Sequence, residues 1–208
     1  MNDNTFFPDM HDKNILMDDV AKYSITLPDK AQTISEIIKK NYQLVFPTDD
    51  LTNLIITDAM ACVGGNTLSF SNTFDKVNAI EMNTTRFQYL VNNMNEYKKT
   101  NIFFYNSNYL NLINKLKQNI VFIDPPWGGP IYKSQYKMDI SIQNDEEKDV
   151  KLYELIDNIF LDETTKMIIF KLPTNHNIDN FKNTKYKYKM MCLKNMLLIM
   201  IFKKIEYI

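Results

Sequence analysis

Glycine is scarce in this chain. It has 4 glycines in 208 residues, and they fall in two pairs, Gly64-Gly65 and Gly128-Gly129. Other turns must use Asn, Asp and Pro, so these two places need either a positive φ angle or backbone that a side chain would obstruct. Ordinary tight turns are the competing explanation. The pairs therefore mark two loops where a ligand can approach the main chain.

Cysteine, arginine and histidine are also rare. Cys62 and Cys192 are the only cysteines, Arg86 is the only arginine, and His11 and His176 are the only histidines. This set provides neither a disulfide framework nor a pattern of zinc ligands, and we expect no metal. A signal-peptide pattern and an apolar run of membrane-spanning length are absent too. These absences predict an intracellular protein of the cytoplasm or nucleus with no membrane partner.

The chain carries no strong charge of either sign. Its formal net charge is -1, so any contact with nucleic acid must come from a local patch. The length and a hydrophobic share of 45% predict one domain with a well-buried core. We also expect a monomer. We expect residues 1–45, which include a helix at 29–41, to form an N-terminal extension packed on a main domain of residues 46–208. The abundant asparagine and lysine fit a viral or other AT-rich genome.

From residue 53 onward, short β-rich apolar runs alternate with amphipathic stretches of helix length, as in a parallel sheet covered by helices. Strands are expected at 54–57, 77–80, 102–105, 120–123 and 167–172. Helices are expected at 66–73, 84–97, 109–117 and 150–160. The stretches 186–193 and 195–203 predict a closing antiparallel hairpin, and the polar segment 141–149 predicts a mobile loop. The predicted fold is therefore α/β, with a mostly parallel, Rossmann-like, seven-stranded sheet.

The loops after the first three strands have the features of a cofactor site, because ligands bind beyond the carboxyl ends of parallel strands. The loop from Asp58 to Asn66 contains a glycine pair, but it is neither a GxGxxG nor a phosphate loop, which favours a cofactor without phosphate. Glu81 can accept hydrogen bonds from both hydroxyls of a ribose, although a solvated strand end would look the same. Asn108 offers an oxygen to an adenine amino group.

The loop after the fourth strand has the features of an acceptor site for methyl transfer. Pro125 and Pro126 remove two amide donors and fix the direction of the carbonyl oxygens. Asp124 and the Pro125 carbonyl can accept the two hydrogens of an exocyclic base amine, which makes its delocalised lone pair a better nucleophile in line with a sulfonium methyl group. Trp127 offers a stacking surface of about 1–3 kcal/mol per base, unless it is ordinary core packing.

Two motifs together resemble those of the trimethylguanosine synthases, which methylate the N2 amine of the 7-methylguanosine cap on RNA. Residues 63–67 repeat the family's Val-Gly-Gly-Asn-Thr, and residues 125–132 match its Pro-Pro-Trp-Gly-Gly-Pro followed by an aromatic residue, apart from Ile131 inserted before Tyr132. The resemblance runs from about Tyr23 to Phe202. It implies a class I methyltransferase fold, S-adenosylmethionine as cofactor, capped RNA or a cap nucleotide as partner, and a di- or trimethylguanosine cap as product.

The expected site comprises three sets of residues. S-adenosylmethionine is expected to contact Thr26, Asp58, Ala59, Gly64, Gly65, Asn66, Glu81, Met82, Asn108, Tyr109 and Asp124. The catalytic set is Asp124, Pro125, Pro126 and Trp127. The cap is expected to contact Trp127, Tyr132, Lys171 and Asn175.

Two departures from the family pattern leave alternatives open. Asp124 stands where the family has serine, and an aspartate also begins the motif of adenine amino methyltransferases acting on DNA or RNA. Those enzymes need a further domain to flip a base out of a duplex, for which 208 residues leave little room. A non-catalytic module that binds the cap or the cofactor is the third possibility, against which the intact motifs argue.

The second departure is Thr174, which stands where the family has an arginine near the cap phosphates. Lys171, Lys133 or the alternating Lys185, Lys187 and Lys189 are the candidate replacements. A strand would place the three alternating lysines on one face, where they could meet phosphates. The same alternation is typical of a solvated edge strand.

Overall fold

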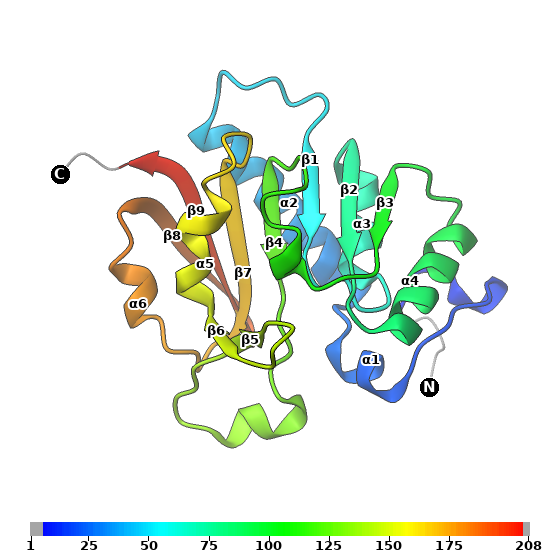
Figure 1. Ribbon diagram of the computed structural model, residues 1–208. Helices are drawn as coiled ribbons and strands as arrows, with labels where there is room; N and C mark the ends of the chain where they lie inside the picture. Colours follow the sequence, from blue (N-terminus) through cyan, green and yellow to red (C-terminus); the bar gives the residue numbers. More distant parts are fainter. Residues whose placement is uncertain (1–5, 206–208) are drawn as a thin grey trace.

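The computed structural model describes residues 6–205, apart from the side chains of residues 130, 131 and 205. A seven-stranded sheet forms its centre, in the order β3-β2-β1-β4-β7-β9-β8 (Figure 1). The parallel strands are β1 Ile55–Asp58, β2 Lys76–Ile80, β3 Ile102–Tyr105, β4 Ile120–Ile123 and β7 Met167–Pro173. The antiparallel hairpin is β8 Tyr186–Leu193 and β9 Met196–Ile205. The predicted α/β fold, with a mostly parallel sheet closed by an antiparallel hairpin, is confirmed.

Helices cover both faces of this sheet because its strands are apolar on both sides. In β4, Ile120 and Phe122 belong to one core cluster, whereas Val121 and Ile123 belong to the other. The first face is covered by α2 Pro28–Val45, α3 Gly65–Thr73 and α4 Thr84–Glu96. The second face is covered by α5 Leu155–Ile159 and α6 Asp179–Lys182. A parallel strand buried on both sides reads as a continuous apolar run, which is why these strands were recognisable in the sequence.

The helix predicted at 109–117 is absent, and that prediction was wrong. A short 3-10 helix, η2 Tyr109–Asn111, is followed by turns. The buried Gln118 donates its side-chain Nε2 to the carbonyl of Ile113, at 3.1 Å. That carbonyl would otherwise pair with a backbone amide one helical turn later, so the side chain replaces the helical bond.

The segment 141–160 also differs from the prediction. Its first part was expected to be a mobile loop, but it contains a small antiparallel hairpin of β5 Ser141–Gln143 and β6 Asp149–Lys151. Only η4 Leu152–Glu154 and α5 are helical in the second part. Ile142 in the middle of β5 is buried, and its polar neighbours concealed this in the sequence.

The N-terminal residues share the main core. Phe7, Ala21 and the α2 residues Ile34, Ile38 and Tyr42 are buried in the cluster that contains the first face of the sheet. Before α2, the chain forms η1 Met10–Asp12 and α1 Asp19–Ser24, within a stretch expected to be irregular. The division into an extension of residues 1–45 and a domain of residues 46–208 stays a prediction. No helix within residues 6–205 is long and apolar enough to cross a membrane.

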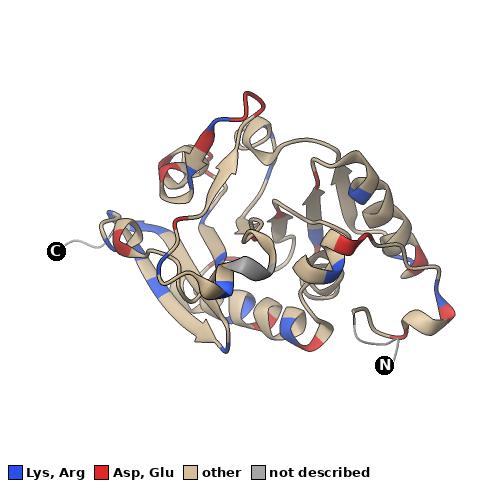
Figure 2. Cartoon of the chain, turned by 90° about the horizontal axis from the view of Figure 1, so that it is seen from below, with Lys and Arg blue, Asp and Glu red and all other residues tan. Residues whose placement is uncertain are grey.

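The carboxyl ends of β1, β2, β3 and β4 meet at one edge of the sheet, which Figure 2 views directly. The strand order reverses between β1 and β4, which are neighbours in the sheet although β2 and β3 separate them in sequence. Crossover helices leave in opposite directions at such a switch point and open a crevice between the loops. The fold therefore predicts the ligand site at the ends of β1 and β4.

Asn93 of α4 holds the N-terminal segment against this framework. Its Oδ1 accepts a hydrogen bond from the amide of Leu16 at 2.8 Å, and its Nδ2 donates to the carbonyls of Leu16 and Val63. We expect Asn93→Ala to lower the free energy of unfolding by about 3 kcal/mol, because three buried or partly buried backbone groups lose their partner. Denaturant titration measures this. The exposed Asn95→Ala on the same helix is the control, and an equal loss in both variants would contradict the anchoring role.

Candidate functional site

A single cleft of about 570 Å³ runs along the carboxyl edge of the sheet. It joins the loops after β1, β2 and β3 to the loop after β4, and the N-terminal segment around α1 forms part of its wall. The predicted cofactor residues that line it are Thr26, Ala59, Glu81, Met82, Asn108, Tyr109 and Asp124. The predicted acceptor residues Pro125, Pro126 and Trp127 line the same cleft. The fold therefore brings the two halves of the predicted site into one continuous space.

The remaining predicted cofactor residues, Asp58, Gly64, Gly65 and Asn66, do not line this cleft, but two of them carry unsatisfied buried polar atoms. Within the described part of the chain, the buried side-chain atoms without a hydrogen-bond partner are Thr26 Oγ1, Asp58 Oδ1, Asn66 Oδ1 and Gln118 Oε1. Buried polar groups are nearly always paired, so each such atom needs an explanation. Three of the four belong to predicted cofactor residues. All three can accept a hydrogen bond, which fits a ligand with an ammonium group.

Asp58 ends β1 and is completely buried. Burial raises the pKa of its carboxyl group to about 7; the hydrogen bond from Thr67 Oγ1 to Oδ2, at 2.6 Å, opposes the shift, and the nearby Asp124 and Glu81 add to it. A buried carboxylate is stabilised by a neighbouring cation. Asp58 is therefore poised to release its proton when a positively charged ligand arrives.

Glu81 follows β2 and is held at the cleft by backbone amides. Its Oε2 accepts from the amide of Cys62 at 3.0 Å, and its Oε1 accepts from the amide of Asn83 at 2.8 Å. Each carboxylate oxygen has a second lone pair, so both can still accept a hydrogen bond from a hydroxyl. This arrangement is compatible with the predicted ribose contact and fixes where the carboxylate lies.

The side chain of Asn108, which was predicted to contact adenine, already makes two hydrogen bonds within the protein. Its Oδ1 caps η2 by accepting from the amide of Leu110, and its Nδ2 donates to the carbonyl of Gln143 in β5 at 2.8 Å. Only the second lone pair of Oδ1 remains for an adenine amine. The side chain therefore also links the third loop to the β5–β6 hairpin.

The two glycine pairs are needed for different reasons. A Cβ atom at Gly65 would lie 2.5 Å from Ile25 Cγ1 and 3.0 Å from the carbonyl oxygen of Thr26, so this glycine lets the N-terminal segment pack on the loop after β1. Gly128 has open space around it, but its φ angle of 83° disfavours any other residue. Close approach explains the first pair and backbone conformation explains the second.

Asp124 lies at the junction of the two halves. Its Oδ2 accepts from Lys171 Nζ at 2.6 Å and from Asn66 Nδ2 at 3.3 Å. Burial raises the pKa of Asp124, while the charge and hydrogen bond of Lys171 and the hydrogen bond of Asn66 act against this rise. The carboxylate is therefore tied to the loop after β1 and to the end of β7.

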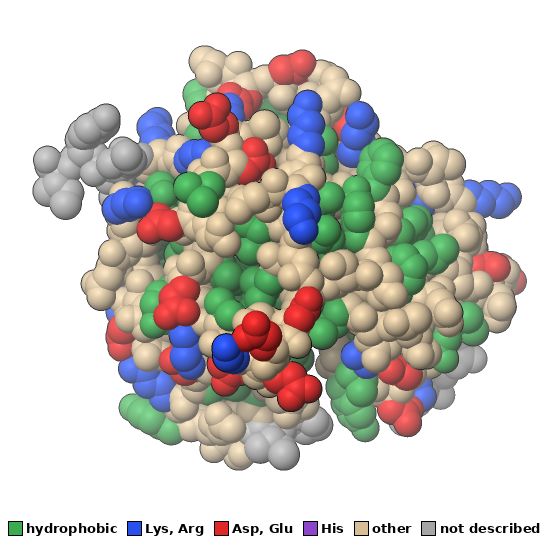
Figure 3. Space-filling model, viewed as in Figure 1, with side chains coloured by type: hydrophobic (Ala, Val, Ile, Leu, Met, Phe, Trp, Pro, Cys, Tyr) green, Lys and Arg blue, Asp and Glu red, His purple; other side chains and the backbone are tan. Residues whose placement is uncertain are grey.

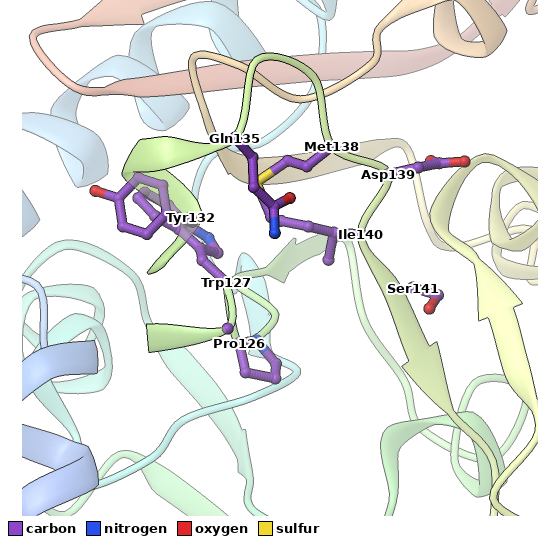
Figure 4. Close-up of a pocket in the computed structure, with 9 residues that line it drawn as sticks. Pro126, Trp127, Tyr132, Gln135, Met138, Asp139, Ile140 and Ser141 are labelled. Atoms are coloured by element: carbon purple, nitrogen blue, oxygen red, sulfur yellow. The ribbon is translucent and has the colours of Figure 1, made fainter. Parts of the chain in front are cut away.

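Trp127 forms a wall between the cleft and a side cavity of about 290 Å³. Its indole Nε1 donates to the carbonyl of Lys171 at 3.3 Å, and its ring meets the Tyr132 ring edge-on, with centroids 5.1 Å apart. Figure 4 shows Gln135, Met138 and Ile140 around the space beside these two rings. The ring is thus held by one hydrogen bond and one aromatic contact and is only partly buried, as a stacking surface must be.

Comparison with known proteins gives this geometry a context. A family model of RNA cap guanine-N2 methyltransferases matches residues 53–202. The chain belongs to this family. Uncharacterized protein L320 of Acanthamoeba polyphaga mimivirus is 37% identical over 186 residues, which cover 80% of this chain and 70% of that protein.

Solved structures support the fold. An rRNA methylase from Streptococcus thermophilus is similar over 86% of this chain and 98% of its own, with a TM-score of 0.57 and 12% identity. Precorrin-6y C5,15-methyltransferase from Geobacter metallireducens is similar over 83% and 88%, with a TM-score of 0.55 and 15% identity. At these identities the likeness concerns the fold alone. Family and fold together make the protein a methyltransferase of class I, the class that uses S-adenosylmethionine.

The residues expected at the cap phosphates have other partners in this family member. Asn175 Nδ2 donates to the carbonyls of Tyr132 and Gln135, so both of its amide hydrogens are used to hold the loop beside Trp127. Lys171 is buried and directed at Asp124. The expectation that these two side chains grip phosphates does not agree with the geometry.

Of the three alternating lysines, Lys185 lies just before β8 and does not share a face with Lys189 of β8. Lys185 pairs with Asp157 of α5 at 3.0 Å, whereas Lys189 donates to Asn41 of α2 at 2.9 Å. These helices cover opposite faces of the sheet, so the expectation of one basic face was wrong. A register irregularity between Tyr186 and Lys187 disrupts the alternation that the prediction assumed.

Arg86 was not expected at the site. Its guanidinium bridges Asp18 at 3.2 Å and Glu81 at 3.8 Å, so it joins the start of α1 to the acidic residue after β2. Val20 and Tyr23 of α1 are exposed and line the same cleft. Arg86 is the one arginine in a lysine-rich chain, which is the signal that could have singled it out. The described residues contain no group of three or more His, Cys, Asp or Glu that could hold a metal ion.

The pKa of Asp58 leads to a prediction about cofactor binding. Adenosylhomocysteine carries an ammonium group, and we expect its affinity to rise about tenfold between pH 6 and pH 8, because Asp58 ionises near pH 7. Calorimetric titration across this range measures the effect. Asp58→Asn is expected to bind weakly and without this pH dependence, while the exposed Glu163→Gln behaves like the unmodified protein. Equal pH dependence in Asp58→Asn would contradict the assignment.

Proposed function

We propose that the protein transfers a methyl group from S-adenosylmethionine to the N2 amine of a 7-methylguanosine RNA cap. The observation that carries this proposal is the single cleft, which joins the predicted cofactor residues Thr26 and Glu81 to the motif of Asp124 and Trp127. The family match supports guanine N2 as the target. One end of the cleft suits the cofactor, and the other suits a flat base with an exocyclic amine.

The acceptor motif can activate a base amine with its own atoms. The carboxylate of Asp124 and the carbonyl of Pro125 accept the two amine hydrogens, which counteracts the delocalisation of the nitrogen lone pair. The cofactor supplies an electrophilic methyl group on a sulfonium, so no metal is required for the leaving group. Positioning the amine in line with that methyl group is the main task of the protein.

Trp127 favours a positively charged base. A cation within about 6 Å of an indole centroid is attracted by the ring quadrupole. The ring already attracts one cation here, because Lys171 Nζ lies 4.9 Å from its centroid. A 7-methylated guanine is both flat and cationic, and it can combine stacking with this attraction.

Two lysines are available for the cap phosphates. Lys30 of α2 and Lys133 of η3 Gly129–Ser134 line the cleft, and neither forms an ion pair within the described chain. The other cations of the cleft, Arg86 and Lys171, are paired with carboxylates. Lys30 and Lys133 therefore replace the grip that Thr174 cannot supply.

Negatively charged side chains cluster at the β5–β6 hairpin, part of which lines the cleft. Its turn carries the exposed residues Asp145, Glu146 and Glu147, and the exposed Asp149 begins β6. Figure 3 shows acidic side chains over this hairpin. Phosphates are repelled by such a surface, so the RNA chain leaves the cleft away from the hairpin.

An adenine amine is the second candidate acceptor, and Asp124 is the observation that favours it. Comparing 7-methylguanosine diphosphate, guanosine diphosphate and adenine-containing oligonucleotides as methyl acceptors separates the two. We expect transfer to the first only. Transfer to adenine alone would overturn the proposal, and cofactor binding with no transfer to any acceptor would favour a non-catalytic module.

The stacking role of Trp127 predicts a graded mutational series. Trp127→Ala should reduce methyl transfer to 7-methylguanosine diphosphate by more than about 100-fold, because up to about 3 kcal/mol of stacking is lost together with the alignment of the amine. Trp127→Phe keeps a flat ring and should retain more activity. Circular dichroism checks that both variants fold. Full activity in folded Trp127→Ala would refute this role.

The phosphate role of Lys30 and Lys133 is tested with two substrates. Lys30→Gln and Lys133→Gln should each raise the KM for 7-methylguanosine diphosphate by roughly fivefold and weaken its salt dependence, because an exposed charge contact is worth about 1 kcal/mol. The KM for the nucleoside 7-methylguanosine, which has no phosphate, should not change. Lys115→Gln, an exposed lysine that does not line the cleft, is the control. Equal effects on both substrates would exclude phosphate contact.

A further inference from the structure

Lys171 is a charged residue in an otherwise apolar strand. It occupies the middle of β7, whose seven residues are all buried, and its own side chain is 5% exposed. A lysine in such a place must be paired or neutral, because burying an isolated ammonium is costly. Its partner is Asp124 Oδ2, at 2.6 Å. The pair therefore lies inside the acceptor half of the cleft and not on the surface.

The hydrogen bonds divide the two oxygens of Asp124. Lys171 and Asn66 both donate to Oδ2, and no described residue donates a hydrogen bond to Oδ1. Asp124 lines the cleft, and its side chain keeps 11% of its surface exposed. Oδ1 is consequently the oxygen left for a ligand, and its direction is set by the two donors on the other oxygen.

The same lysine also orients the stacking surface. Its backbone carbonyl accepts the hydrogen bond from Trp127 Nε1, and its ammonium lies over the Trp127 ring. One residue thus touches both groups that must act on the base, the carboxylate through its side chain and the indole through its backbone.

We propose that Lys171 is a positioning residue for methyl transfer, which keeps Asp124 ionised and turns Oδ1 toward the acceptor amine while its backbone carbonyl aligns Trp127. The inference rests on the proposed function of the cleft. As the bond between the nitrogen and the methyl carbon forms and the sulfur–methyl bond breaks, the nitrogen must lose one proton. An ionised carboxylate can accept that proton and pass it to solvent, whereas a protonated one cannot.

The loss of Lys171 should change the pH dependence of methyl transfer in a defined direction. Burial raises the pKa of Asp124 and Lys171 lowers it. Removing the lysine therefore raises that pKa further, and the ionised, active form appears only at higher pH. Asp58 is the other titratable group that interacts with this carboxylate, because the charge of Asp124 adds to the rise in the pKa of Asp58. A lysine with only a structural role would change stability without moving the pH profile.

The experiment compares Lys171→Met, Asp124→Ser and the double variant with the unmodified protein, using 7-methylguanosine diphosphate as acceptor. Lys171→Met should lower kcat by about 100-fold at pH 7 and shift the acid limb of the pH profile to higher pH. Asp124→Ser leaves a buried lysine without its partner and should also lose activity. The double variant removes both charges and should be more stable and more active than the product of the single effects predicts.

Fluorescence provides a readout that needs no turnover, because Trp127 is the only tryptophan. In Lys171→Met, we expect its emission to titrate with pH as Asp124 ionises, at a higher pH than in the unmodified protein. Lys166→Met is the matched control, since Lys166 forms an ion pair of the same length, 2.6 Å, with Asp49 away from the cleft. It should lower stability without changing either profile.

The outcomes separate the two proposals. If the unmodified protein methylates the cap nucleotide and Lys171→Met keeps the same pH profile and emission titration, Lys171 is not a positioning residue. If the unmodified protein methylates no cap nucleotide, the proposed function fails, and the emission titration still tests the link between Lys171 and Asp124. Strict multiplicativity in the double variant would also overturn the inference.

Discussion

The parallel sheet brings three carboxylates together, and the rest of the site depends on how their charge is offset. Asp58 and Glu81 follow the adjacent strands β1 and β2, and Asp124 follows β4 on the other side of β1. Carboxylates that lie close together in a buried place repel one another when ionised, which favours either their protonation or the binding of cations. Lys171 supplies one cation beside Asp124, and Arg86 lies near Glu81. In our account, the cofactor and a cationic base supply the other positive charges. The negative charge of the three carboxylates is therefore fully offset only when both ligands are bound.

The N-terminal segment completes the wall of this site. Gly65 allows Ile25 and Thr26 to approach the loop after β1, Asn93 fastens the residues before α1, and Arg86 connects α1 to Glu81. The cofactor half of the cleft therefore depends on contacts between the N-terminal segment and α4. The segment packs into the same core as the sheet, which ties the integrity of the cleft to overall stability.

Much of the fold could be predicted because its signals are local. Buried parallel strands are continuous apolar runs, and the motif of Asp124 to Trp127 is contiguous, so both were visible in the sequence. The turns at 109–117 were not, because the side chain of Gln118 substitutes for a helical hydrogen bond, a tertiary effect. The functions of Lys171 and Asn175 also depend on partners more than 40 residues away. A register irregularity between Tyr186 and Lys187 was enough to separate Lys185 from Lys189.

A crystal structure with adenosylhomocysteine and 7-methylguanosine diphosphate bound tests the central claim most directly. The account predicts the cofactor ammonium among Thr26, Asp58 and Asn66, the guanine on Trp127, and its N2 amine within hydrogen-bond distance of Asp124 Oδ1 while Lys171 stays on Oδ2. A cap base bound outside the cleft, or an Asp124 separated from Lys171 and turned away from the amine, would contradict it.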